Sequence, residues 1–225
     1  MNLARLGLAS LIILTVAGCK ADQREARRSE GPMMANQKFE DVKEPPIQAQ
    51  TRFAAGKLAE SRNDFRRAGV QYAAALQLDP NHLPAMNRLA VAYAMTRQTE
   101  QSIEIAKRYV KATGSTADAW NHLAQCYEFA NKLSDAEAAY KSGIEKDPTN
   151  ALCRTNFGLL LARTGRIEEA AAQMSSVLKP AEVHYNLASI LEMQGDTAGA
   201  KQAYKKALEA DPNLTDAKKR LAAIE

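Results

Sequence analysis

The sequence predicts an all-α superhelix of about five helix-turn-helix repeats with a C-terminal capping helix. Three observations favour this fold class. The 225-residue chain is rich in alanine and only 6% aromatic, which is typical of helical proteins. The dipeptide Asp-Pro recurs at Asp79-Pro80, Asp147-Pro148 and Asp211-Pro212, with spacings of 68 and 64 residues between the prolines. Small residues recur at two fixed positions of the frame that these prolines define.

The small residues indicate where two helices of each repeat cross. With each proline at position 32 of a 34-residue frame, the predicted repeats cover residues near 49–82, 83–116, 117–150, 151–180 and 181–212. Position 8 of the five repeats holds Gly56, Ala90, Ala124, Gly158 and Ala188, and position 20 holds Ala68, Ser102, Ala136, Ala170 and Ala200. Two helices approach each other closely only where neither carries a bulky side chain. Each repeat is therefore predicted to be a helical hairpin.

Two repeats depart from the pattern. The second has Gly114 where the others have proline, and glycine also ends a helix. The fourth is only 30 residues long, from Ala151 to Pro180, so we expect its second helix to be about a turn shorter or its turn to be tighter.

The end of the chain, residues 213–225, is predicted to be an amphipathic helix. Leu214, Ala217, Leu221 and Ile224 fall on one face of it. A repeat array needs such a cap to cover its last apolar surface.

Together, the 34-residue period and the small residues resemble the tetratricopeptide repeat (TPR) family, which also favours a tryptophan where this chain has Trp120. The resemblance covers residues 49–212. It implies that the first helix of each repeat lines a concave groove for a protein or peptide segment. The groove positions of the family correspond here to Phe53, Lys57, Asn87, Arg88, Asn121, His122, Gln125, Glu128, Asn156, Tyr185, Asn186 and Glu192.

Asparagine recurs among these groove residues in four of the five repeats. Its amide both donates and accepts hydrogen bonds, so it can pair with the backbone of an extended peptide. The alternative is that these amides are only solvated or bond to neighbouring groups.

The first 18 residues are predicted to be a signal peptide. After Arg5, the apolar run Leu6–Ala17 has 12 residues, too few to span a bilayer, which takes about 20. A buried core helix is the weaker alternative, because the run has no amphipathic period. The motif Val16-Ala17-Gly18-Cys19 resembles the lipobox of bacterial lipoproteins. This implies that Cys19 carries a covalent lipid and becomes the first residue of the mature chain.

Residues 19–45 are predicted to form a flexible tether, because they contain six basic and six acidic residues and few apolar ones. Lys20, directly after Cys19, is compatible with anchoring in the outer membrane. The folded domain, residues 46–225, would then face the periplasm.

The sequence contains no motif of a catalytic or metal site. His82, His122 and His184 are scattered through the repeats, and no cysteine lies in a C-x-x-C pair. Cys126 and Cys153 are expected to be buried core residues, with a disulfide between them left open. The net charge of +4 is too small to indicate a nucleic-acid binder. We therefore expect no enzymatic activity, no metal and no cofactor apart from the lipid.

These observations predict a membrane-anchored scaffold of the bacterial cell envelope that binds a protein or peptide partner. Its architecture is similar to that of TPR lipoproteins that assemble pili, so pilus or secretion-system assembly is the preferred setting. The alternatives are an adaptor for cell-wall hydrolases and a self-associating structural lipoprotein, for which a homodimer is expected. A TPR module that targets an enzyme is disfavoured, since no remaining segment is large enough to be a catalytic domain.

Overall fold

The computed structural model describes residues 47–224, so the signal segment, Cys19 and the predicted tether lie outside the described residues. Within residues 47–224 the chain forms eleven α-helices and no strand. The helices are α1 (Ala49–Ser61), α2 (Phe65–Leu78), α3 (Leu83–Met95), α4 (Thr99–Ala112), α5 (Ala117–Phe129), α6 (Leu133–Lys146), α7 (Ala151–Arg163), α8 (Ile167–Ser175), α9 (Pro180–Met193), α10 (Thr197–Ala210) and α11 (Thr215–Ile224).

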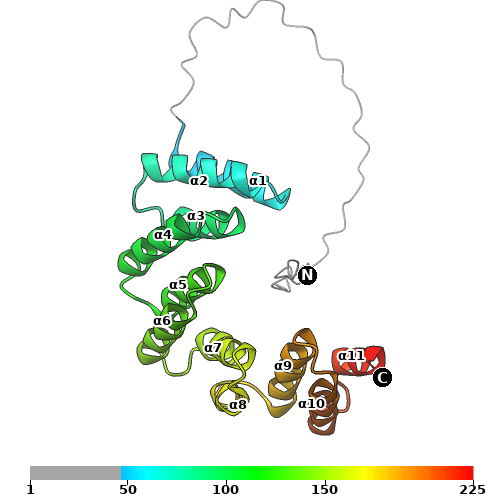
Figure 1. Cartoon of the computed structure of the whole chain (residues 1–225). Coiled ribbons are helices and arrows are strands. Elements are labelled where there is room, and N and C mark those ends of the chain that lie inside the picture. The colour runs from blue at the N-terminus through cyan, green and yellow to red at the C-terminus, as the bar shows by residue number, and fades with distance from the viewer. Residues whose placement is uncertain (1–46, 225) are drawn as a thin grey trace, which may run out of the picture. The chain divides into compact units, whose positions relative to one another are not determined.

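The first ten helices form five antiparallel hairpins that follow one another in sequence order, and α11 packs on α10 (Figure 1). Each second helix contacts the first helix of the next hairpin, and α3, α5, α7 and α9 also contact one another in turn. The odd-numbered helices therefore share one face of the row. The predicted fold class, a superhelix of about five repeats with a cap, is confirmed.

Each hairpin turns at the same position of its repeat. The residue there has a positive φ in all five turns, namely Asn63 (58°), Arg97 (63°), Asn131 (58°), Gly165 (83°) and Gly195 (84°). The following backbone N–H then donates to the carbonyl five residues back, as Asp64 does to Ala59 at 3.0 Å and Arg166 to Leu161 at 2.9 Å. Glycine and asparagine suit this left-handed conformation, which explains their recurrence.

The recurring Asp-Pro pairs build the connections between hairpins. Asp79 accepts a hydrogen bond from the N–H of Asn81 at 3.0 Å, and Asp147 does the same with Thr149 at 2.9 Å. This side-chain turn replaces the helical bonds that the following proline cannot make. The sequence signal thus marks a turn with a defined hydrogen bond.

In the first and fourth hairpins, the glycine at position 8 lies against a large residue at position 24 of the same repeat. A Cβ atom added to Gly158 on α7 would lie 2.6 Å from Cγ of Met174 on α8, and one added to Gly56 would overlap the Tyr72 ring. Met174 and Tyr72 are fully buried. The small residues are therefore needed because the partner helix fills the space with its own side chain.

The fourth repeat is shortened in its second helix. Helix α8 has 9 residues, whereas α6 and α10 each have 14. This confirms the expectation drawn from the short fourth repeat.

None of the described helices is long and apolar enough to cross a bilayer.

The buried apolar side chains form two clusters. The larger one runs through the first four hairpins and includes Val183, Leu187 and Ile190 on one side of α9. The smaller one joins α9, α10 and α11 around Tyr204 and Ala217, with Leu221 packed against it. The predicted cap thus covers the last apolar surface of the array.

Candidate functional site

The twelve groove residues predicted from the sequence all lie on the odd-numbered helices α1, α3, α5, α7 and α9. These helices share one face, so their side chains form one surface. The side chains differ in what they do there. Some line pockets, some bond to each other, and some are held in ion pairs.

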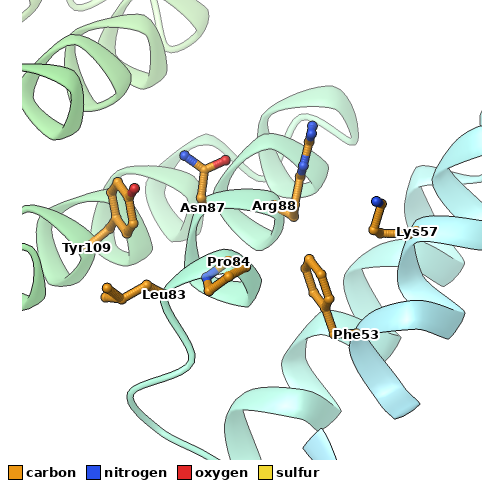
Figure 2. Close-up of a pocket in the computed structure, with 7 residues that line it drawn as sticks. All are labelled: Phe53, Lys57, Leu83, Pro84, Asn87, Arg88 and Tyr109. Carbon is orange, nitrogen blue, oxygen red and sulfur yellow. The ribbon is translucent and has the colours of Figure 1, made fainter. Parts of the chain in front are cut away.

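The first pocket lies between α1 and α3 and has a volume of about 310 Å³. Figure 2 shows Phe53 and Lys57 on the α1 side and Asn87 and Arg88 on the α3 side, with Tyr109 of α4 at the far end. Leu83 and Pro84 complete the lining. The pocket therefore combines apolar and aromatic walls with an amide and two cations.

A second pocket, of about 250 Å³, lies at the other end of the same face. It is lined by Thr155, Leu178, Glu182, Tyr185, Asn186 and Leu214. Like the first pocket it sets an asparagine amide beside an aromatic ring, but its charged residue is an acid.

The amides in the middle of the groove bond to each other. Asn156 on α7 donates to the side-chain oxygen of Asn121 on α5 at 2.8 Å, and Asn121 is 7% exposed. In contrast, neither the Asn87 nor the Asn186 side chain makes a hydrogen bond within residues 47–224. The two amides in the pockets are thus the ones open to a ligand.

His122 is a structural residue of this surface rather than an exposed one. The residue is 7% exposed, and its Nε2–H donates to the backbone oxygen of Asn87 at 3.1 Å. Its Nδ1 lies 3.7 Å from Sγ of Cys126. Burial, together with the positive charge of Arg88, lowers the pKa of His122 to about 4. A neutral His122 therefore joins α5 to α3.

Two predicted groove acids are held in clusters of tyrosine, glutamate and arginine. Glu128 accepts from the Tyr140 hydroxyl of its own hairpin and pairs with Arg163 of the next. Glu192 likewise accepts from Tyr204 at 2.7 Å and pairs with Arg220 at 3.2 Å. In each cluster the carboxylate links the two helices of one hairpin to the element that follows.

Arg88 belongs to a third such cluster. It pairs with Glu60 at 3.1 Å, and Glu60 accepts from the hydroxyl of Tyr72. Within residues 47–224 the clusters occur in the first, third and fifth hairpins. In the second and fourth hairpins the glutamate is replaced by Ala94 or Ala162. The tyrosine there is replaced by Ala106 or Met174. The polar network therefore repeats every two hairpins.

Both described cysteines are free and buried. Cys153 donates to the backbone oxygen of Ala117 at 3.2 Å, and burial raises the pKa of its thiol to about 11. The expectation of two buried core cysteines is confirmed. Within residues 47–224, no group of three or more His, Cys, Asp or Glu side chains is placed to hold a metal ion.

Comparison with protein families accounts for the repeats. Three sequence models, each described as tetratricopeptide repeat, match residues 53–126, 129–180 and 181–214. Together they cover more than half of the chain. The chain belongs to the tetratricopeptide repeat family.

Curated TPR relatives match only part of the chain. It is 27% identical to the general transcriptional corepressor ssn6 of Schizosaccharomyces pombe, over 59% of this chain and 12% of that protein. It is 29% identical to tetratricopeptide repeat protein 8 of Caenorhabditis elegans, over 73% of this chain and 34% of that protein. The chain thus spans about a third or less of the length of these relatives.

Solved TPR structures share the fold over most of the chain. TTC0263 of Thermus thermophilus has a TM-score of 0.57 at 21% identity, covering 78% of this chain and 98% of that one. MamA has a TM-score of 0.56 at 20% identity, covering 75% and 94%. YrrB, a TPR protein with an unusual peptide-binding site, has a TM-score of 0.50 at 20% identity, covering 77% and 91%.

Sequence reasoning missed seven pocket residues. Four of them lie on first helices but were not among the predicted groove residues, namely Leu83, Pro84, Thr155 and Glu182. The other three lie outside the first helices. Tyr109 lies on the second helix α4, and Leu178 and Leu214 lie in connections. One signal was available. Tyr109 occupies a repeat position that is small in three other repeats, where it is Ala75, Gly143 and Ala207. A large residue at a normally small position indicates a local change in packing.

Proposed function

We propose that this chain is a membrane-anchored TPR scaffold of the bacterial cell envelope that binds an extended segment of a partner protein in its groove. The observation that carries the proposal is the pair of pockets on one face. Each sets an unengaged asparagine amide, Asn87 or Asn186, beside aromatic walls. Such an amide can bond to a peptide backbone through both its donor and its acceptor.

A peptide ligand also agrees with YrrB, the similar TPR protein that has a peptide-binding site. Apolar side chains at the ends of three first helices, Met95, Phe129 and Met193, are exposed and offer further contact area. Binding a segment of chain, rather than catalysing a reaction, is the role that these features support.

The anchoring part of the proposal rests on Val16-Ala17-Gly18-Cys19, which lies outside the described residues. A lipid on Cys19 would hold the domain at a membrane and would bring a captured partner there. We propose pilus or secretion-system assembly as the setting, on architectural similarity to TPR lipoproteins of that role.

The groove is tested by the double variant Asn87→Ala/Asn186→Ala in the full chain. Loss of two hydrogen bonds would weaken partner binding by about 2 kcal/mol, or about thirtyfold in Kd. Recovery of cross-linked envelope proteins should fall accordingly. The matched control is Gln101→Ala/Gln202→Ala, which removes two exposed amides from second helices. Equal recovery with both double variants would contradict the groove.

The anchor is tested separately. Labelled palmitate should enter the wild-type protein but not Cys19→Ala, and the variant should leave the membrane fraction. Equal labelling of both proteins would show that Cys19 is not the lipid attachment site.

A further inference from the structure

The two ends of the groove differ in charge. Residues 47–116, which form the first two hairpins, contain ten Lys and Arg but only five Asp and Glu. Residues 117–224 contain thirteen of the former and fourteen of the latter. The positive excess of the folded domain therefore lies in the two hairpins that form the pocket between α1 and α3.

Two cations of this excess line the pocket itself. Lys57 is exposed and makes no ion pair or hydrogen bond within the described residues 47–224. Arg88 uses Nη1 to reach Glu60, which leaves its other N–H groups for a ligand. With Glu60 included, the mouth of the pocket retains one net positive charge.

The rest of the pocket lining is mainly apolar or aromatic. Phe53, Leu83, Pro84 and Tyr109 line the pocket beside Asn87 (Figure 2). Its volume of about 310 Å³ is at the small end for a ligand site and suits one large side chain rather than a cofactor. The pocket at the other end of the groove has no cation among its lining residues and contains Glu182.

We propose that the α1–α3 pocket selects a partner segment in which a bulky apolar residue stands next to an aspartate or glutamate. The apolar side chain enters between Phe53 and Tyr109, and the carboxylate pairs with Lys57 and the open side of Arg88. Because the other pocket is acidic, this preference also sets which end of the bound segment lies at α1. The inference rests on the proposed function, since it requires a peptide in the groove.

The proposed preference of the α1–α3 pocket is tested by fluorescence anisotropy with synthetic peptide probes. The probes are fluorescein-labelled twelve-residue Gly-Ser peptides with blocked ends, carrying either one Phe-Asp pair or one Phe-Asn pair, so that the aspartate is the sole carboxylate of the peptide. The full chain should bind the Phe-Asp probe about fivefold to tenfold more tightly. The substitution Lys57→Gln should weaken binding of the Phe-Asp probe far more than binding of the Phe-Asn probe, and so remove most of that difference.

The control is Lys107→Gln, which removes an exposed lysine of α4 that belongs to the same basic region but not to the pocket. It should preserve the preference for Phe-Asp. An equal loss in the two lysine variants, or competition by tripolyphosphate at the same concentration as by the Phe-Asp peptide, would reduce the effect to general attraction of anions and overturn the inference.

The remaining outcomes separate the two proposals. If both probes bind equally and Asn186→Ala weakens both, the groove binds peptides but the selection of an acidic residue is wrong. If neither probe binds at millimolar protein concentration, peptide binding itself is contradicted and the inference falls with it.

Discussion

At the residue scale, Glu128 joins α5 to both α6 and α7 through its carboxylate. It is largely buried between the Tyr140 hydroxyl and the Arg163 guanidinium. Glu128→Ala would leave both donors without an acceptor, and we expect a loss of about 2–3 kcal/mol in the free energy of unfolding. Urea titration followed by circular dichroism measures this. Glu145→Ala, an exposed acid of α6, should change the midpoint little.

A second prediction at the residue scale concerns how the free energy of unfolding changes as the pH falls. The folded-state pKa of His122 lies near 4, below its usual value of 6.5. Its stabilising contribution is therefore complete above pH 6.5 and is lost as the pH falls through 4, by about 3 kcal/mol in total. The unfolding free energy of His122→Asn should fall less steeply over this range than that of the wild type.

The matched control for His122→Asn is His184→Asn, at a half-buried histidine of α9. It removes an imidazole without affecting the hydrogen bond between His122 and Asn87, so it controls for the loss of a histidine as such. Parallel pH profiles for His122→Asn and the wild type would contradict the role of a neutral His122.

At the element scale, the crossing of each hairpin depends on space at position 8. Gly158→Ala would place a methyl group against buried Met174, so we expect a loss of about 1–3 kcal/mol despite the better helix propensity of alanine. Gly69→Ala is the contrasting case. Its added Cβ would meet only ordinary contacts, 3.7 Å from Ala92, and should stabilise α2 by about 0.5–1 kcal/mol. Thermal unfolding compares the two.

The helices could be predicted from the sequence because their pattern of residues recurs from repeat to repeat. The proline frame and the small residues indicate the hairpins, and the missing four residues before Pro180 indicate the short α8. Side-chain partners were less predictable. The family frame directs Asn121 and His122 into the groove, yet both are buried because neighbouring first helices pack against them. Such burial depends on the distance between neighbouring helices, and this distance could not be predicted from the sequence alone.

The tyrosine–glutamate–arginine clusters are a second feature that the sequence alone did not predict. Glu60 and Tyr72 lie twelve residues apart, as do Glu128 and Tyr140. This spacing is visible in the sequence, but only the hairpin geometry brings the two side chains into contact. The pockets likewise needed the structure, since the first is lined from three helices and the second from two helices and two connections.

At the scale of the whole molecule, the core is divided at α9 into a larger cluster shared with the first four hairpins and a smaller one shared with α10 and α11. The smaller cluster depends on α11, which buries Ala217 and supplies Arg220 to Glu192. Deleting residues 213–225 should expose the apolar side of α10, lower the melting temperature and cause self-association. Light scattering after size exclusion detects the association.

The exposed face of α11 provides the control for this deletion. Lys218→Gln/Lys219→Gln changes its charge without touching the smaller cluster, so mass and melting temperature should stay those of the wild type. A truncated chain that remains monomeric and equally stable would contradict the capping role of α11.

Hairpins whose glutamate bonds to a tyrosine alternate along the array with hairpins that lack both residues. Removing the second hairpin alone, residues 83–116, would set Glu60 against His122 and Phe129 and leave its carboxylate without a cation. Removing residues 83–150 would instead bring Arg163 to the place from which it already serves Glu128. The natural increment for lengthening or shortening this array is therefore a pair of hairpins, twice the unit that the helices display.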